Sequence, residues 1–189
     1  SKKSVVGVIA QSTVKSLSGR VDELDSKGRG ALAGEIAQVA SSNLGDAGIA
    51  SSDIEGVAGR ITQNQVKVLD QIGISFTDMS AAAAEIATGA AKGATTLVTT
   101  TAEKSKVIES VAAQAMAAPV PATEASGAPK VAEEVTKSLV VALTEIGFAA
   151  SEIAEPAKAA ISGAATGLKS AGAGAAVGLE AVANGSAAG

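Results

Sequence analysis

The chain of 189 residues contains no cysteine, histidine, tryptophan or tyrosine. Without cysteine it can form neither disulfides nor thiolate metal sites, and without histidine it lacks the commonest metal ligand and acid–base group. A serine nucleophile would have no histidine to activate it. We therefore predict a protein that is not an enzyme and that has no catalytic residues, no cofactor and no metal site.

Aromatic residues are scarce, since two phenylalanines are the only ones present. Large aromatic side chains supply much of the buried area of an ordinary core. Here 21 glycines and many alanines take their place. The composition predicts a core made of many small contacts between closely approaching helices, in long helices or through self-association.

Strong charge of one sign is also lacking, because the formal net charge is −4 and the basic residues are dispersed. This pattern gives no footprint for a phosphate backbone, so we exclude nucleic acid as a partner. The chain starts at Ser1 without a charged-then-apolar signal, which favours a processed or trimmed chain. Export to an extracellular location is one expectation, although the residues do not fix the compartment.

One eleven-residue pattern recurs three times and organises the chain. A leucine is followed four residues later by glycine, then by an apolar residue, a Ser or Thr, an acid and a closing apolar residue. Such a glycine can end a helix in the left-handed conformation, and the hydroxyl can cap the next helix. The pattern predicts three helix–helix corners, with positive φ at the glycines: Leu44–Ile54, Leu69–Met79 and Leu143–Ile153, with Gly48, Gly73 and Gly147 and the caps Ser52, Thr77 and Ser151.

Apolar periodicity places helices between these corners. The segment DSKGRG at 25–30 is typical of a turn. One helix of about forty residues is expected after Thr77, with a weak point at the β-branched run 95–101. The expected helices are Val5–Leu24; Ala31–Ala47, with Leu32, Ile36, Val39 and Leu44 inward; Asp53–Ile72; Thr77–Ala118; Lys130–Ile146; and Glu152 to about Val182.

Three prolines set among small residues mark 119–129 as a stiff linker. It would separate an N-terminal helical part, 1–118, from a C-terminal helical hairpin, 130–189, that packs on the first part. The sequence thus predicts an all-α fold, an elongated bundle of about six helices built from helical hairpins.

Small residues and a longer similarity suggest how the helices pack. Positions 69–93 and 143–167 correspond at a constant offset of 74 residues, so two hairpins sharing one plan are expected. Glycines four apart let helix backbones approach closely. The pairs are Gly30 and Gly34, Gly89 and Gly93, Gly163 and Gly167, and Gly174 and Gly178.

Few segments could carry chemistry. The segment GAATGLKS at 163–170 lacks the glycine directly before lysine and the preceding strand that a phosphate loop needs, so Lys169 is interpreted as a surface residue. Adjacent acids point in different directions on a helix and are interpreted as solvated. The same holds for two nearby lysines. These acids and lysines are Asp22 with Glu23, Glu133 with Glu134, and Lys104 with Lys106.

The end of the chain allows two special interpretations. Asn184-Gly185-Ser186 fits a glycosylation sequon, which matters only in a secretory pathway, and a flexible terminus is favoured. Ala157–Ala183 is long enough to span a bilayer, but a central Lys169 would be costly there. Packing against another helix, in this chain or a neighbour, is the preferred interpretation.

Three classes of function are compatible with these features. The preferred one is a non-enzymatic structural or interaction protein, a helical subunit of a coat, fibre, matrix or larger assembly, with protein partners or self-association. The alternative is a protein whose amphipathic helices bind lipid or another hydrophobic surface, although interfacial aromatics are missing. A small-molecule carrier or enzyme is the least supported class, because no convergent set of polar groups is recognisable.

Overall fold

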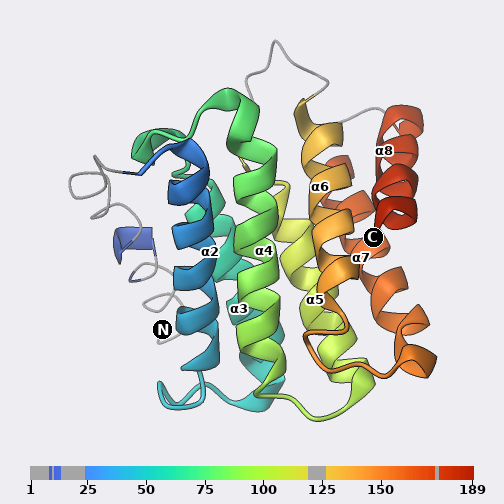
Figure 1. Ribbon diagram of the computed structural model, residues 1–189. Helices are drawn as coiled ribbons and strands as arrows, with labels where there is room; N and C mark the ends of the chain where they lie inside the picture. The colour runs from blue at the N-terminus through green and yellow to red at the C-terminus, as the bar shows by residue number, and fades with distance from the viewer. Residues whose placement is uncertain (1–8, 10, 14–23, 119–126, 173–174) are drawn as a thin grey trace.

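The computed structural model describes residues 9, 11–13, 24–118, 127–172 and 175–189 (Figure 1). These residues are helical and contain no strand, which confirms the predicted all-α bundle. Three short 3-10 helices, Asp70–Ile72, Phe76–Asp78 and Ala150–Glu152, lie at the corners. The α-helices are α2 (Ser26–Ser42), α3 (Ser51–Val66), α4 (Met79–Thr95), α5 (Thr101–Ala115), α6 (Gly127–Ala142), α7 (Ala154–Ser170) and α8 (Ala175–Ala188).

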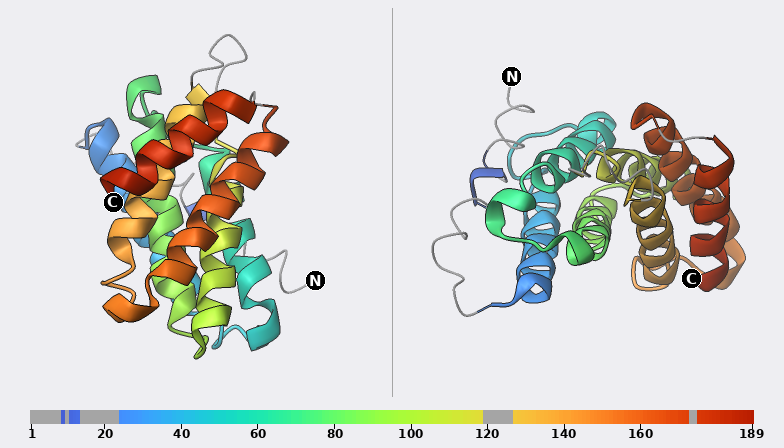
Figure 2. Two further views of the ribbon diagram at one scale, coloured as in Figure 1. Left: turned by 90° about the vertical axis from the view of Figure 1, so that its right-hand side faces the viewer. Right: turned by 90° about the horizontal axis from the view of Figure 1, so that it is seen from above.

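Helices α2, α4 and α6 stand side by side in Figure 1, and α3 and α5 lie behind them. The view from above in Figure 2 shows the same order, with α7 and α8 closing the far side. The largest contacts join α2 to α4 and α5 to α7. Helix α4 also packs on α6, so the helices before and after residues 119–126 share one hydrophobic core.

The three predicted corners have one backbone geometry. Gly48, Gly73 and Gly147 have φ values of 73°, 75° and 93°, as predicted. At the first corner the amide of Ile49 donates to the carbonyl of Leu44 at 3.0 Å, and the amide of Gly48 donates to Gly45 at 2.9 Å. This pair of bonds is the Schellman motif. The same two bonds recur at Leu69–Ile74 and at Leu143–Phe148.

The apolar residues of the motif close each corner by burial. The leucine that opens the motif is fully buried at all three corners, and the residue after the glycine is at most 8% exposed. Both residues belong to the hydrophobic core. The corner therefore ties the end of one helix to the core from both sides of the glycine.

The predicted caps of the following helices are wrong by two residues. Ser52, Thr77 and Ser151 lie inside the next helical turn, and the cap positions are Ala50, Ser75 and Ala149. The acid of the motif consequently stands at the third helical position, where it can accept from the cap amide. At the third corner Glu152 does so, accepting from the amide of Ala149 at 3.2 Å.

Glycines bring α2 and α4 into backbone contact. A Cβ added to Gly89 would overlap the carbonyl oxygen of Gly34, and one added to Gly93 would overlap that of Gln38. Only hydrogen fits at these positions, as in other small-residue helix crossings. The predicted close packing of Gly30 and Gly34 and of Gly89 and Gly93 is thus confirmed.

The contact between α5 and α7 matches that between α2 and α4. A Cβ on Gly163 would overlap the carbonyl oxygen of Glu109, and one on Gly167 would overlap that of Ala113. Moving from α2 to α5 adds 75 residues to the matching positions, and moving from α4 to α7 adds 74. The fourth predicted pair, Gly174 and Gly178, involves residue 174, which lies outside the described residues.

A second contact also has a counterpart. Helix α5 meets α3 where a Cβ on Gly59 would strike the hydroxyl of Ser110. Helix α8 meets α6 where a Cβ on Gly185 would overlap the carbonyl oxygen of Glu133. Gly185 follows Ser110 by 75 residues and Glu133 follows Gly59 by 74, so α8 packs on α6 as α5 packs on α3.

The single helix expected from Thr77 to Ala118 is wrong. The chain leaves α4 after Thr95 and begins α5 at Thr101, within the β-branched run that was its weak point. Thr100 starts α5 with a capping box, because its hydroxyl accepts from the amide of Glu103 at 3.1 Å and Glu103 accepts from the Thr100 amide at 3.1 Å. The Thr-x-x-Glu pattern is the sequence signal for this start.

The assignment of 25–30 to a turn is wrong as well. Asp25 caps α2 by accepting from the amide of Gly28 at 2.8 Å, so residues 26–30 form its first turns. The predicted inward face of this helix is wrong too, because Val39 is 61% exposed and Leu32 and Ile36 are only partly buried. The buried face consists of Gly30, Ala33, Gly34, Ala37 and Ser41.

Three boundaries near the ends of predicted segments also differ. Helix α6 begins at Gly127, so the last three residues assigned to the linker form its first turn. The last predicted helix is broken at Gly172, which has a φ of 77°. The predicted helix Val5–Leu24 lies almost wholly outside the described residues, which include only Ile9, 11–13 and Leu24 of it.

Candidate functional site

The most prominent surface feature of the described residues is an apolar groove on the outer side of α2. Its volume is about 460 Å³, and apolar atoms make up nearly all of its lining. The outer groove is formed by Leu32, Glu35, Ile36, Val39, Ala40, Asn43 and Ala47, together with Ile9 and Thr13 from the N-terminal segment.

The groove exists because α2 carries two faces of different size. Its small residues face α4, where Gly34 allows backbone contact, and this orientation turns the large aliphatic side chains away from α4. The apolar periodicity of Leu32, Ile36 and Val39 was visible in the sequence. The line of glycine and alanine at three- and four-residue spacing was the signal for which side would be buried.

A small polar cluster lies at the start of α2. The hydroxyl of Ser26 accepts from the amide of Ser75 at 2.7 Å, and the hydroxyl of Ser75 donates to the carboxylate of Asp78 at 2.5 Å. Hydrogen bonds from Ser75 and Ser26 lower the pKa of Asp78 from its ordinary value. A carboxylate held ionised and already bonded in this way fixes the second corner onto α2.

A second carboxylate with a lowered pKa has a similar structural role. The pKa of Glu103 lies below its ordinary value chiefly because the carboxylate accepts from the amide of Thr100, and the Thr100 hydroxyl and the Thr99 amide add to this effect. Glu103 and Asp78 belong to different helix starts. The perturbed groups therefore stabilise helix ends, which is a common structural cause of such shifts.

The sequence segment closest to a phosphate loop lies in a helix. Residues 163–170 form the second half of α7, and Gly163 and Gly167 face α5 in the close contact described above. Lys169 is exposed in the last turn of α7. The segment therefore has neither the strand nor the loop that phosphate binding by this motif requires.

The acids and lysines singled out from the sequence are not brought together. Glu133 and Glu134 are half-buried neighbours on α6. Within the described ranges, no three acidic side chains are grouped closely enough to hold a metal ion. Lys106 is exposed, whereas the ammonium of Lys104 lies 5.4 Å from the ring centre of Phe148. Asp22 and Glu23 lie outside the described residues.

The sequon Asn184-Gly185-Ser186 lies in α8, so the interpretation of these residues as a flexible terminus is wrong. Gly185 is buried against α6, and the hydroxyl of Ser186 donates to the carbonyl of Ala183 at 2.8 Å. The predicted helix–helix packing of the last segment is thus seen within the chain. Among the helices that the structure describes, none combines the length and apolar character needed to cross a bilayer.

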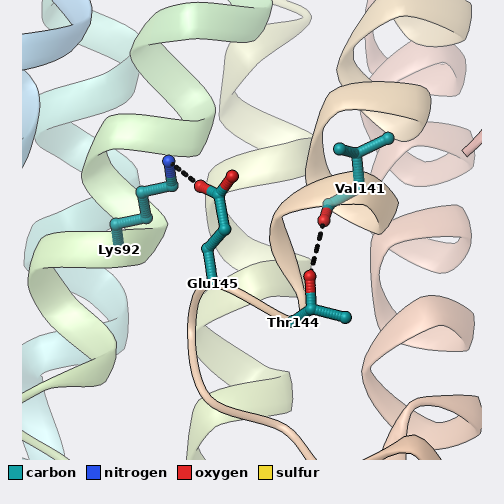
Figure 3. Close-up of polar contacts among 4 residues, drawn as sticks. All are labelled: Lys92, Val141, Thr144 and Glu145. Atoms are coloured by element: carbon teal, nitrogen blue, oxygen red, sulfur yellow. Dashed lines mark hydrogen bonds and ion pairs between the residues drawn. The ribbon is translucent and has the colours of Figure 1, made fainter.

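An ion pair at the third corner links α4 to the end of α6. The ammonium of Lys92 on α4 contacts the carboxylate of Glu145, which lies in the turn after α6 (Figure 3). In the same turn the hydroxyl of Thr144 donates to the carbonyl of Val141 at 3.4 Å. Val141 itself is 51% exposed, and it lies on α6, far along the chain from the outer groove of α2.

Comparisons with known proteins give no relative from which site residues could be transferred. No protein-family model matches the chain, and no curated protein matches it. The outer groove of α2 is therefore the candidate site on geometry alone. Its chemistry is that of an apolar contact surface, since Glu35 is the only ionisable residue among its lining residues.

Proposed function

We propose that this chain is a non-enzymatic structural or interaction protein, a helical subunit of a coat, fibre, matrix or larger assembly. The observation that carries the proposal is the recurrence of one packing arrangement along the chain. Helices α2, α5 and α8 begin at Ser26, Thr101 and Ala175, which are 75 and 74 residues apart. Their contacts with the helices around them match at the same offsets.

We infer from this recurrence a unit of three helices that is used repeatedly. Helices α2–α4 form one unit, α5–α7 form the next, and α8 takes the position of the first helix of a third. The first helix of each later unit packs on the second and third helices of the unit before it. Units stacked in this way build extended surfaces, which serve binding and assembly in other repeat proteins.

The proposed assembly is tested by measuring particle mass as a function of protein concentration. Multi-angle light scattering and electron microscopy are expected to show particles larger than the monomer, or a stoichiometric complex in material purified from the native source. Val141→Asp changes an exposed apolar residue and preserves the fold, so it tests whether α6 contributes to the contact. A monomer at every concentration, with no stoichiometric partner, would contradict the proposal.

The outer groove of α2 supports the alternative function, binding to lipid or another hydrophobic surface. Partly exposed aliphatic residues on one helical face are what an interfacial helix needs. In this alternative, vesicles of anionic phospholipid would carry the protein upward in a flotation gradient, and Val39→Asp would reduce the bound fraction. A protein that stays entirely at the bottom of the gradient removes this alternative.

A further inference from the structure

The outer groove of α2 is an apolar helix face with an incomplete cover. Val39 is 61% exposed, and Ile36 and Ala40 are partly buried although they lie beside the core. The residues that reach the groove from elsewhere in the chain are Ile9 and Thr13. Figure 1 shows the described turn around them beside α2.

The fold shows how the matching face is covered on α5. Val107, Val111 and Ala115 lie 75 residues after Leu32, Ile36 and Ala40, and each is at most 1% exposed. On that side α5 packs against α3 and α4. The same face of a helix is thus buried under other helices in one case and partly open in the other.

The N-terminal segment has the sequence and the connection to fill this place. Ile9 and residues 11–13 are helical, and the hydroxyl of Thr13 donates to the carbonyl of Ile9 at 2.9 Å. Leu17, Val21 and Leu24 continue the line of Ile9 and Thr13 at three- and four-residue spacing, on one helical face.

The connection to α2 sets the direction of this segment. The side chain of Arg29 donates to the carbonyl of Leu24 at 3.0 Å, and Asp25 caps α2, so the chain turns directly into α2. Ile9 precedes Leu24 by fifteen residues, which span about 22 Å in a helix. The same length along α2 from residue 25 reaches Ala40, which lines the groove beside Val39.

We propose that residues 5–24 form one amphipathic helix seated antiparallel in the outer groove of α2, with Leu17 against Leu32. The occupant of the groove is therefore a segment of this same chain. This docking is intramolecular and holds whether or not the protein assembles with other molecules, so it is independent of the proposed function.

Cross-linking of introduced cysteines tests the proposed register, because the chain has no cysteine of its own. In the full-length protein, Leu17→Cys with Leu32→Cys is expected to form an intramolecular disulfide at least about tenfold faster than the control pair Lys15→Cys with Leu32→Cys. Residue 15 lies nearly half a turn around the helix from residues 13 and 17. Equal rates for the two pairs would overturn the proposal, as would disulfides formed mainly between two chains.

Hydrogen exchange provides a second test that needs no substitution in the N-terminal segment. Amides of residues 5–24 are expected to be protected in the full-length protein, and Val39→Glu is expected to remove that protection while α5 to α8 keep theirs. Val39 is largely exposed, so this variant retains the fold. Free exchange of residues 5–24 in the unchanged protein would overturn the proposal.

Discussion

Helices α4 and α7 occupy matching positions, yet their surroundings differ. Helix α4 lies between α2 and α6, and its Ala84 and Thr95 are 2% and 3% exposed. The positions 74 residues later on α7 are Lys158 and Lys169, and both are exposed. The backbone contact with the partner helix is nevertheless the same, through two glycines four residues apart. The comparison teaches that glycines fix the shared contact, whereas the remaining faces follow the position of each helix in the molecule.

The largest expected effect comes from filling a glycine contact in each of these two helices. Gly89→Ala places a methyl group against the backbone of α2, and we expect a loss of about 3 kcal/mol of unfolding free energy. Gly163→Ala makes the matching change in α7, which lies at the edge and can shift outward, so about 1 kcal/mol is expected. Urea unfolding followed by circular dichroism measures both.

A matched control for these variants is Gly56→Ala in α3, where an added Cβ meets no atom within 4 Å. Alanine is the better helix former, so this variant should gain about 0.5–1 kcal/mol. Equal losses for Gly89→Ala and Gly163→Ala would contradict the distinction between an enclosed and an edge helix.

The corners allow the next comparison, because two of them share a backbone but not their surroundings. Gly147→Ala is expected to cost about 1–2 kcal/mol through left-handed strain alone, since the space around it is open. Gly73→Ala should cost more, because the added methyl displaces Arg29, whose side chain donates to Ile72 at 3.1 Å. Thermal unfolding ranks the two variants, and a neutral Gly147→Ala would show that the corner does not need its positive φ.

The start of α5 gives a smaller effect that depends on pH. The folded-state pKa of Glu103 lies below its ordinary value of 4.5, so its contribution to stability is present above that value and is lost as the pH falls through the lowered pKa. Glu103→Gln should therefore lower the melting temperature at pH 7 and converge with the unchanged protein in acid. Glu55→Gln on the exposed side of α3 is the control. A difference that persists unchanged at low pH would contradict this role.

The ion pair between α4 and the end of α6 should have the smallest effect. Lys92 and Glu145 are 31% and 59% exposed, and ion pairs at such sites contribute about 0.5 kcal/mol, which salt reduces. A double-mutant cycle with Lys92→Ala and Glu145→Ala measures the coupling. A coupling that is large and insensitive to salt would mean that this contact holds the two sets of helices together.

The sequence predicted the features that depend on local backbone chemistry. The all-α class and the three glycine corners follow from spacing and from the left-handed conformation that glycine tolerates. The capping serines were misplaced because the motif offers several hydroxyls, and the turn geometry selects a position two residues earlier. The break near Thr100 was visible as a β-branched run followed by a capping box.

The buried faces were harder to predict. Periodicity of large aliphatic residues usually identifies the inward face of a helix. In α2 it identified the outer groove, because the close approach of α4 at Gly34 favours the small-residue face. The candidate site was therefore recognised in the sequence as a set of residues, Leu32, Ile36 and Val39, but was assigned to the wrong side of the helix.

The central claim is that α2 with α4 and α5 with α7 are packed in the same way through glycine. Proton nuclear Overhauser effects test it directly, because a Cβ on Gly93 would lie against the Cβ of Ser41, and one on Gly167 against the Cβ of Met116. Strong effects are predicted from the α-protons of Gly93 to the β-protons of Ser41, and from those of Gly167 to those of Met116. The absence of either effect in the folded protein would contradict the account.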